Sequence, residues 1–183
     1  GGYYTHWEFD NDLVQEMVSV LSKSKVDYIE LGYKSPLPGG RFRKCNDNFI
    51  SQLLKNVSYD SRLAFMIDAK DFIEDNKVNK RLLLDVIKPK DKSPFTLCRI
   101  ATNYETLDQS LEMLEIISEL GYETALNLMK VAMLSKLEVG LALEKVGKSS
   151  VGMIYIADSL GSLHGKKLEY LIDLFRTSCD EWD

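Results

Sequence analysis

The spacing of hydrophobic and polar residues along the chain alternates between a helical and an extended pattern. Apolar residues recur every three or four positions in the helical segments and run almost continuously through the extended ones. The pattern predicts helices over residues 10–25, 48–58, 78–87, 104–120, 135–146 and 166–178, and strands over residues 27–33, 63–68, 95–101, 124–129 and 151–158. The rest of residues 71–92 has no clear pattern, and we expect a solvated loop at its end.

This order, one helix followed by five strand–helix units, predicts a parallel sheet. The units repeat about every 30 residues, and parallel strands need helical connections. Two α/β architectures share this pattern: an open doubly wound sheet, and a (β/α)8 TIM barrel of about 250 residues. The chain has 183 residues and begins abruptly in a Gly-Gly-Tyr-Tyr loop, as though a strand preceded it. We therefore expect one domain over residues 1–183, an incomplete parallel (β/α)8 barrel with about five to six βα units.

Composition and charge narrow the class of protein. With 45% hydrophobic and 28% charged residues, the chain is neither disordered nor fibrous. The 23 basic and 28 acidic residues give a net charge of −5, and no basic stretch favours nucleic acid. Three scattered cysteines lack zinc-site or disulfide spacing. No signal peptide or membrane-length apolar run is evident, so we expect a cytoplasmic protein that binds neither nucleic acid nor membranes.

Each predicted strand is apolar inside and carries polar side chains at its carboxyl end. Ligands bind at this end of the strands in both architectures. The polar residues are Glu30, Asp68 with Lys70, Arg99, Asn127 and Asp158. Each of them alone can simply face water at a strand end. Polar residues at matching positions of all five strands predict one shared polar pocket, because a charge inside an apolar strand costs several kcal/mol unless it is paired, coordinated or solvated.

The pocket predicted from these residues suits a polar, anionic ligand. Arg99 can bind a carboxylate through two hydrogen bonds. Glu30, Asp68 and Asp158 can position water, a metal or a lysine, and Asn127 can orient a carbonyl or hydroxyl group. No nucleophile with an adjacent base is evident in the sequence.

Two loops contain weaker candidates. His6 lies near Tyr3 and Trp7, and it faces the pocket if this loop follows a barrel strand, where it can act in acid–base chemistry. The alternative is a surface histidine. Residues 39–44 combine a Gly-Gly pair with three basic residues and can bind phosphate, although a flexible solvated loop is the simpler interpretation.

Five segments together resemble the pyruvate-aldolase branch of the DRE-TIM metallolyases, also called the HMG-CoA lyase-like family, and within it the 4-hydroxy-2-oxovalerate aldolases. They are residues 1–5 (GGYYT), 28–33 (YIELGY), 98–102 (CRIAT), 126–129 (LNLM) and 155–161 (YIADSLG). Each segment is short and only moderately specific. Their joint occurrence, in the order and spacing of the family across almost the whole chain, is far more specific.

The resemblance implies a (β/α)8 barrel with a divalent metal, usually Mn²⁺ or Mg²⁺, that chelates a 2-oxo acid. In this family the metal stabilises the enolate formed when a carbon–carbon bond breaks or forms. The implied activity is that of an aldolase, a carbon–carbon lyase, acting on a small 4-hydroxy-2-oxo acid. Glu30, Arg99, Asn127 and Asp158 match pocket positions of the family, and we expect Arg99 to bind the substrate carboxylate.

The sequence also departs from the family pattern. The family's Arg-Asp pair would stand directly before Gly1, and its His-x-His metal ligands would follow the last helix. We therefore expect an incomplete metal site and an inactive chain. The catalytic-base histidine of the hydroxy-oxovalerate aldolases falls at Tyr3, and His6 is the nearest histidine. Tyr3 and His6 are thus the catalytic candidates.

Two other functions stay open. One is a Claisen-type acyltransferase of the same superfamily, similar to isopropylmalate or citramalate synthase. The other is a non-catalytic, flavodoxin-like binding module, which the lack of a GxGxxG or Walker loop disfavours. Unpaired edges of an incomplete barrel favour association between copies of the chain. The aldolases of this family often associate with an aldehyde dehydrogenase, but no feature of the sequence reports on that partner.

Overall fold

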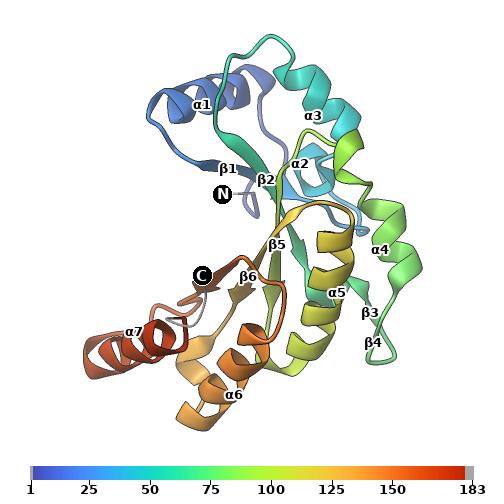
Figure 1. Ribbon diagram of the computed structural model, residues 1–183. Coiled ribbons are helices and arrows are strands. Elements are labelled where there is room, and N and C mark those ends of the chain that lie inside the picture. Colours follow the sequence, from blue (N-terminus) through green and yellow to red (C-terminus); the bar gives the residue numbers. More distant parts are fainter. Residues whose placement is uncertain (1, 180–183) are drawn as a thin grey trace.

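The computed structural model describes residues 2–179, and its centre is a parallel five-stranded sheet (Figure 1). The strands are β1 (Tyr28–Tyr33), β2 (Arg62–Asp68), β5 (Leu97–Thr102), β6 (Glu123–Leu128) and β7 (Met153–Ile156). They lie in the order β1-β2-β5-β6-β7, and every neighbouring pair is parallel. Each strand therefore lies beside the strands that precede and follow it in the parallel sheet.

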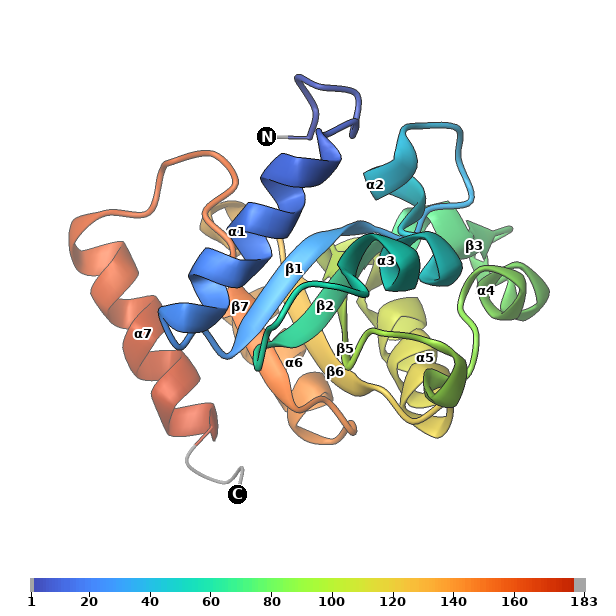
Figure 2. The same cartoon turned by 90° about the horizontal axis from the view of Figure 1, so that it is seen from above.

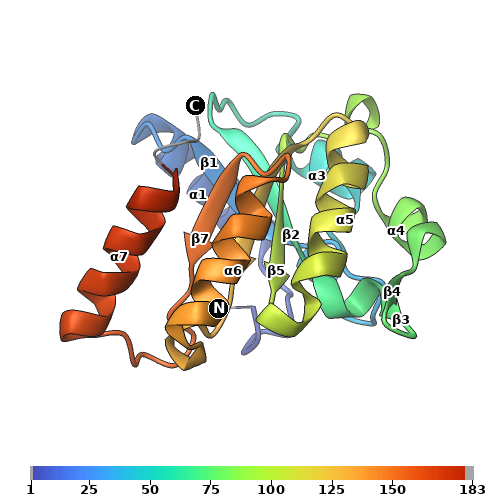
Figure 3. The same cartoon turned by 60° about the horizontal axis from the view of Figure 1, so that its bottom comes forward.

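The helices cover one face of this sheet. A connection between parallel strands is almost always right-handed, so a strand order that never reverses places all connecting helices on the same side. Figure 3 shows α5 and α6 in front of the sheet. The helices are α1 (Asn11–Lys23), α3 (Asp47–Leu54), α4 (Lys80–Val86), α5 (Leu107–Glu119), α6 (Lys136–Gly147) and α7 (Gly165–Cys179).

The two faces of the sheet have different surroundings. Phe65 and Ile100 are buried with the helices in one large hydrophobic core. Ala64, Leu97 and Ala125 form a separate small cluster. Because successive side chains of a strand point to opposite faces, this second cluster marks the face that carries no helix. We call it the inner face.

This arrangement confirms the predicted fold, an incomplete parallel (β/α)8 barrel. A flavodoxin-like order, 2-1-3-4-5, would place β1 between β2 and β5. Instead β2 pairs directly with β5, with Met66 in register with Arg99. The doubly wound alternative is therefore wrong. Within residues 2–179, β1 and β7 each pair with one strand of the sheet, so the sheet is open at both edges.

Local sequence signals explain where the helices begin. The carboxylate of Asp10 accepts hydrogen bonds from the N–H groups of Asp12 and Leu13 at the start of α1. At the start of α6, Ser135 and Glu138 form the capping box that their spacing predicts. No helix in the described part of the chain is both long and apolar enough to cross a membrane.

Two segments differ from the prediction, one between β2 and β5 and the other before β2. Residues 73–78 form a small antiparallel hairpin, β3 (Ile73–Glu74) and β4 (Lys77–Val78). Its turn residues have positive φ angles of 48° and 60°, as a type I′ turn requires. Helix α3 ends at Leu54 rather than at residue 58, because the chain turns there and packs Val57 against the core.

The basic loop predicted to be flexible is in fact held in place and contains a short helix, α2 (Arg41–Lys44). The N–H of Gly40 donates to the carbonyl of His6, and Arg41 forms an ion pair with Glu8 at 2.7 Å. The N–H of Phe42 donates to the carbonyl of residue 7. The amino-terminal loop and α2 therefore lie together at one end of the molecule, beyond the carboxyl end of β1 (Figure 2).

Candidate active site on the inner face of the sheet

An ion pair between Glu30 and Arg99 lies on the inner face. The Nε of Arg99 donates to Oε2 of Glu30 at 2.7 Å, and Nη2 donates to Oε1 at 2.6 Å. The two residues come from strands separated by β2, where the small side chain of Ala64 is in register with Glu30. The ring of Tyr155 lies 5.4 Å from the guanidinium carbon. An open cavity of about 290 Å³ lies over this pair.

The pair fixes a positive group in a half-exposed setting. The hydrogen bonds that Arg99 donates to Glu30 raise the pKa of Arg99 above its ordinary value, so the guanidinium stays charged. Glu30 engages two of the five N–H donors of a guanidinium, and the others remain free for a second acceptor. A guanidinium held in this way is preorganised to bind a carboxylate or a developing oxyanion.

Asp68 lies on the same face, at the carboxyl end of β2 and in register with Ala101. Its carboxylate accepts a hydrogen bond from the N–H of Lys70 at 3.3 Å, and the Nζ of Lys70 lies 3.0 Å away. The structure therefore places Asp68 at the carboxyl rim of the sheet, beyond the Glu30–Arg99 pair, where it is paired with Lys70.

Asn127 and Asp158 have different surroundings. Asn127 is half-buried and in register with Ala101 and Tyr155, which places it on the inner face nearer the carboxyl rim than Arg99. Asp158 is exposed, and its oxygens accept hydrogen bonds from two backbone N–H groups, of residues 162 and 163, at 2.9 Å each. These N–H groups lower its pKa. The structure thus brings Glu30, Arg99 and Asn127 onto one face and uses Asp158 to stabilise the loop before α7.

The amino-terminal loop brings Tyr3 to the same rim. The hydroxyl of Tyr3 lies 3.3 Å from that of Tyr33, and the ring of Trp7 packs edge-on against both rings. Burial raises the pKa of Tyr33, and Tyr3, Asp68 and Glu30 raise it further, so this phenol stays neutral at neutral pH. The side chain of His6 is exposed, and its carbonyl accepts the hydrogen bond from Gly40. Gly1 lies outside the described residues.

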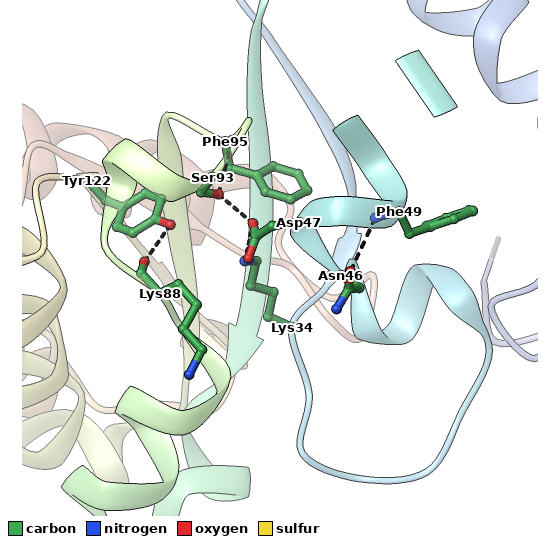
Figure 4. A network of polar contacts seen from close by, with 8 residues as sticks. All are labelled: Lys34, Asn46, Asp47, Phe49, Lys88, Ser93, Phe95 and Tyr122. Carbon is green, nitrogen blue, oxygen red and sulfur yellow. Dashed lines mark hydrogen bonds and ion pairs between the residues drawn. The ribbon is translucent and has the colours of Figure 1, made fainter. Parts of the chain in front are cut away.

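Sequence reasoning missed a buried ion pair on the other side of β1. The side chain of Lys34 is 1% exposed, and its Nζ lies 2.6 Å from both carboxylate oxygens of Asp47 (Figure 4). The hydroxyl of Ser93 also donates to Asp47, at 2.5 Å. Burial lowers the pKa of Lys34, although Asp47 counteracts that effect.

This buried amine does not face the candidate active site. Its Nζ lies 4.9 Å from the ring centre of Phe65 and 5.3 Å from that of Phe95, and both rings belong to the core on the helix side. Lys34 therefore ties β1 to α3 and is not placed to react with a ligand on the inner face. A lysine after a β-prone run gives no sequence signal of burial, because lysine is almost always exposed.

A second polar cluster lies at the amino ends of the strands, also on the inner face. The hydroxyl of Tyr28 donates to the carboxylate of Glu123, and Arg62 forms an ion pair with the same carboxylate at 3.0 Å. Burial and the neighbouring Glu123 raise the pKa of Tyr28 to about 12. Because ligands of such folds bind at the carboxyl ends of the strands, we interpret this cluster as one that stabilises the sheet.

The described side chains do not fit the metal site that the resemblance implies. Among residues 2–179, no three His, Cys, Asp or Glu side chains gather to hold an ion. The candidate carboxylates are engaged elsewhere: Glu30 by Arg99, and Asp68 by Lys70. We therefore derive no chemical step through a metal held by these residues.

Curated proteins similar to the chain are aldolases. It is 25% identical over 168 residues to a 4-hydroxy-2-oxovalerate aldolase of Mycolicibacterium paratuberculosis, and 23% identical over 171 residues to a 4-hydroxy-2-oxohexanoate aldolase of Mycobacterium bovis. Both alignments cover 89% of this chain and 45% of the relative, so the chain spans less than half the length of these enzymes. No model of a known protein family matches the chain.

A solved structure supports the fold. The amino-terminal domain of an aldolase candidate from Bacteroides vulgatus superimposes with a TM-score of 0.77 at 22% identity, and the match covers 97% of this chain and 57% of that one. At this identity the match shows the fold. The relatives named above confirm the resemblance to 4-hydroxy-2-oxovalerate aldolases that the five sequence segments indicate.

Proposed function

We propose that this chain forms part of the barrel domain of an aldolase that cleaves or forms a 4-hydroxy-2-oxo acid through an enolate of pyruvate. The observation that carries the proposal is the Glu30–Arg99 pair on the inner face. Its two residues come from the YIELGY and CRIAT segments of the resemblance. Relatives matched over 89% of the chain are named as aldolases of 4-hydroxy-2-oxo acids.

In this proposal Arg99 binds the carboxylate of the 2-oxo acid through the N–H donors that Glu30 leaves free, and Glu30 fixes the guanidinium plane. Asn127 orients the carbonyl or hydroxyl oxygen. Asp68 and Asp158 complete the carboxyl rim. This proposal assigns no ligand to the divalent metal of the family, because no group of described side chains fits one.

Cleavage of the substrate requires one base. The 4-hydroxyl loses its proton, the bond between C3 and C4 breaks, and the electron pair remains on the 2-oxo acid as an enolate, which then takes up a proton at C3. We propose that Tyr3 or His6 is the base that accepts the proton of the 4-hydroxyl. Tyr3 has the geometry in its favour, because its hydroxyl already contacts Tyr33 at the rim.

An aldol-cleavage assay with added Mn²⁺ tests the proposal, with products identified by mass spectrometry. We expect no turnover by the 183-residue chain and turnover by a longer polypeptide that contains it. Robust turnover by the short chain would contradict the incomplete site. Condensation of pyruvate with acetyl-CoA, without aldol cleavage, would favour the acyltransferase alternative.

The role of Arg99 is tested in the active polypeptide. Arg99→Gln removes a charged hydrogen-bond donor to the substrate carboxylate, and we expect KM for the 2-oxo acid to rise roughly 10- to 100-fold. Arg62→Gln is the matched control, because Arg62 lies on the inner face at the opposite end of the strands, paired with Glu123. Equal effects of the two variants on KM would contradict the assignment.

A further inference from the structure

A separate cavity of about 180 Å³ opens at the carboxyl rim. It lies between the amino-terminal loop, α2 and the turn that follows β2. Its wall includes Tyr3, Trp7, Tyr33, Arg43, Asp68 and Lys70. It is smaller than the roughly 300 Å³ at which sites for drug-sized ligands begin, so it suits a group of a few non-hydrogen atoms.

Of the two cations in this wall, Lys70 has an ion pair and Arg43 has none among the described residues. The Nε of Arg43 is buried and has no hydrogen-bond partner among the described residues. The acidic neighbours are engaged by other groups: Asp68 pairs with Lys70 at 3.0 Å, and Asp71 accepts a hydrogen bond from Ser35 at 2.9 Å. A buried N–H of a charged group is costly when it has no acceptor. Such a group in a native structure indicates that an oxygen atom of a ligand or water binds there.

The loop holds Arg43 in a defined position. A Cβ atom on Gly39 would lie 2.2 Å from the Cδ of Arg43, so the absence of a side chain at Gly39 lets the arginine stem lie against the loop. The N–H of Ser35 donates to the carbonyl of Arg43 at 3.1 Å, and the N–H of Arg43 donates to that of Gly40 at 2.9 Å. The guanidinium is therefore positioned before any ligand arrives, which lowers the entropic cost of binding.

We propose that Arg43 binds the carboxylate of a small organic acid in this cavity. The Nε and Nη2 edge of a guanidinium matches the two oxygens of a carboxylate, and the hydroxyl groups of Tyr3 and Tyr33 can provide further hydrogen bonds. Asp68 belongs to the wall of this cavity and to the candidate active site, so the two adjoin each other. This extension rests on the proposed function. In that reaction, the aldehyde that is released or consumed would carry a carboxylate group, which Arg43 binds.

The binding test uses the fluorescence of Trp7, whose ring lies 4.9 Å from that of Tyr33. In a Trp182→Phe background Trp7 is the sole tryptophan, since the chain has two. Propionate, its uncharged analogue propanamide, and inorganic phosphate are titrated at constant ionic strength. We expect a saturable change with propionate and none with propanamide.

Variants locate the site. We expect Arg43→Gln to weaken propionate binding at least about tenfold, because glutamine cannot form the two charged hydrogen bonds to the carboxylate. Arg43→Lys retains the charge without the fork and keeps part of the affinity. Arg81→Gln, at an exposed position of α4, leaves binding unchanged. Binding of propionate by Arg43→Gln at the original affinity, equal binding of propanamide, or saturation by phosphate alone would overturn the proposal.

A measurement on the unsubstituted chain covers the case in which Arg43→Gln does not fold. Phenylglyoxal modifies arginines, and peptide mass spectrometry follows each site. Propionate should slow modification of Arg43 and leave that of Arg81 unchanged; equal rates at Arg43 with and without propionate contradict the site. None of these readouts needs turnover, so the carboxylate site and the aldolase activity stand or fall separately.

Discussion

Two cations of this protein are paired with carboxylates in contrasting surroundings. Arg99 lies half-exposed on the inner face and keeps donors free for a ligand. Lys34 lies fully inside the helix-side core, where Asp47 and Ser93 enclose its charge. The first pair suits binding and the second suits structure, because a buried charge is tolerated only while its partner is present.

Removing the partner of Lys34 should therefore destabilise the fold strongly. Asp47→Asn leaves the ammonium buried without a counter-charge, and we expect a loss of about 3–5 kcal/mol in the free energy of unfolding, measured with urea. Asp108→Asn is the matched control, because Asp108 pairs with Lys145 at the same 2.6 Å on the surface. A loss in the control as large as that in Asp47→Asn would contradict the importance of burial.

The loss caused by Asp47→Asn should also depend on pH. Burial places the pKa of Lys34 in the folded protein below its ordinary value of 10.5. Between these two pKa values the unfolded chain binds more protons, so the free energy of unfolding rises with pH across that interval. Without Asp47 the interval extends to lower pH. We expect the deficit of Asp47→Asn to shrink as the pH rises toward 10.5, and a constant deficit would count against a charged Lys34 as its cause.

Among single residues, the sequence predicts the site residues that stand out from their neighbours in the chain. Glu30 and Arg99 interrupt apolar strands near their carboxyl ends, and the structure pairs them. Lys34 and Arg43 are not predictable in this way. Their environments come from residues far along the chain, such as the Phe95 ring beside Lys34. Only tertiary packing reveals which lysine is buried and which arginine lacks a partner.

At the scale of elements, the contact between β1 and α2 depends on a glycine. A Cβ atom on Gly32 would lie 2.1 Å from the carbonyl oxygen of Phe42, which is backbone and cannot move aside cheaply. Gly140 in α6 has the opposite surroundings, since nothing lies within 4 Å of a Cβ atom there. Packing therefore requires a glycine at position 32, whereas position 140 has room for a side chain.

Opposite effects are expected for alanine at these two glycines. Gly32→Ala should lower the free energy of unfolding by about 1–3 kcal/mol through overpacking. Gly140→Ala should raise it by about 0.5–1 kcal/mol, because alanine favours the helix and costs less backbone entropy. Urea unfolding of both variants checks the pair, and a neutral Gly32→Ala would show that α2 can shift away from β1.

The elements that the pattern predicts are those long enough to show a period. All five strands of the main sheet and the long helices α1, α5, α6 and α7 occupy their predicted segments to within a few residues. The hairpin of residues 73–78 has strands of two residues each, too short for any alternation to appear. Its turn depends on positive φ angles at Asp75 and Asn76, which the residue types permit but do not require.

At the scale of the whole molecule, the open edge beside β1 lies next to an apolar surface. On α1, Leu13 is 59% exposed and Val20 is 52% exposed. A groove of about 360 Å³, lined by Leu13, Met17 and Leu31 among others, separates this helix from β1. Exposed strand edges with apolar neighbours favour pairing with another chain.

We therefore expect the 183-residue chain to associate with itself as its concentration rises, as sedimentation velocity would show. Leu13→Lys places a charge on this surface and should shift the chain toward the monomer. Leu84→Lys on α4, at a position 44% exposed and away from the edge, is the control and should not. A single monomeric species at all concentrations would count against this expectation.

The uninterrupted strand order has a consequence for how the protein is made. After β1, each strand of the main sheet pairs with the strand of the unit synthesised just before it. The nascent polypeptide can therefore extend its sheet one strand at a time as it leaves the ribosome, and no segment has to wait for a distant one. Within residues 2–179 the strand synthesised last, β7, is also the shortest of the five, so at this stage the growing edge offers little surface to a wrong neighbour.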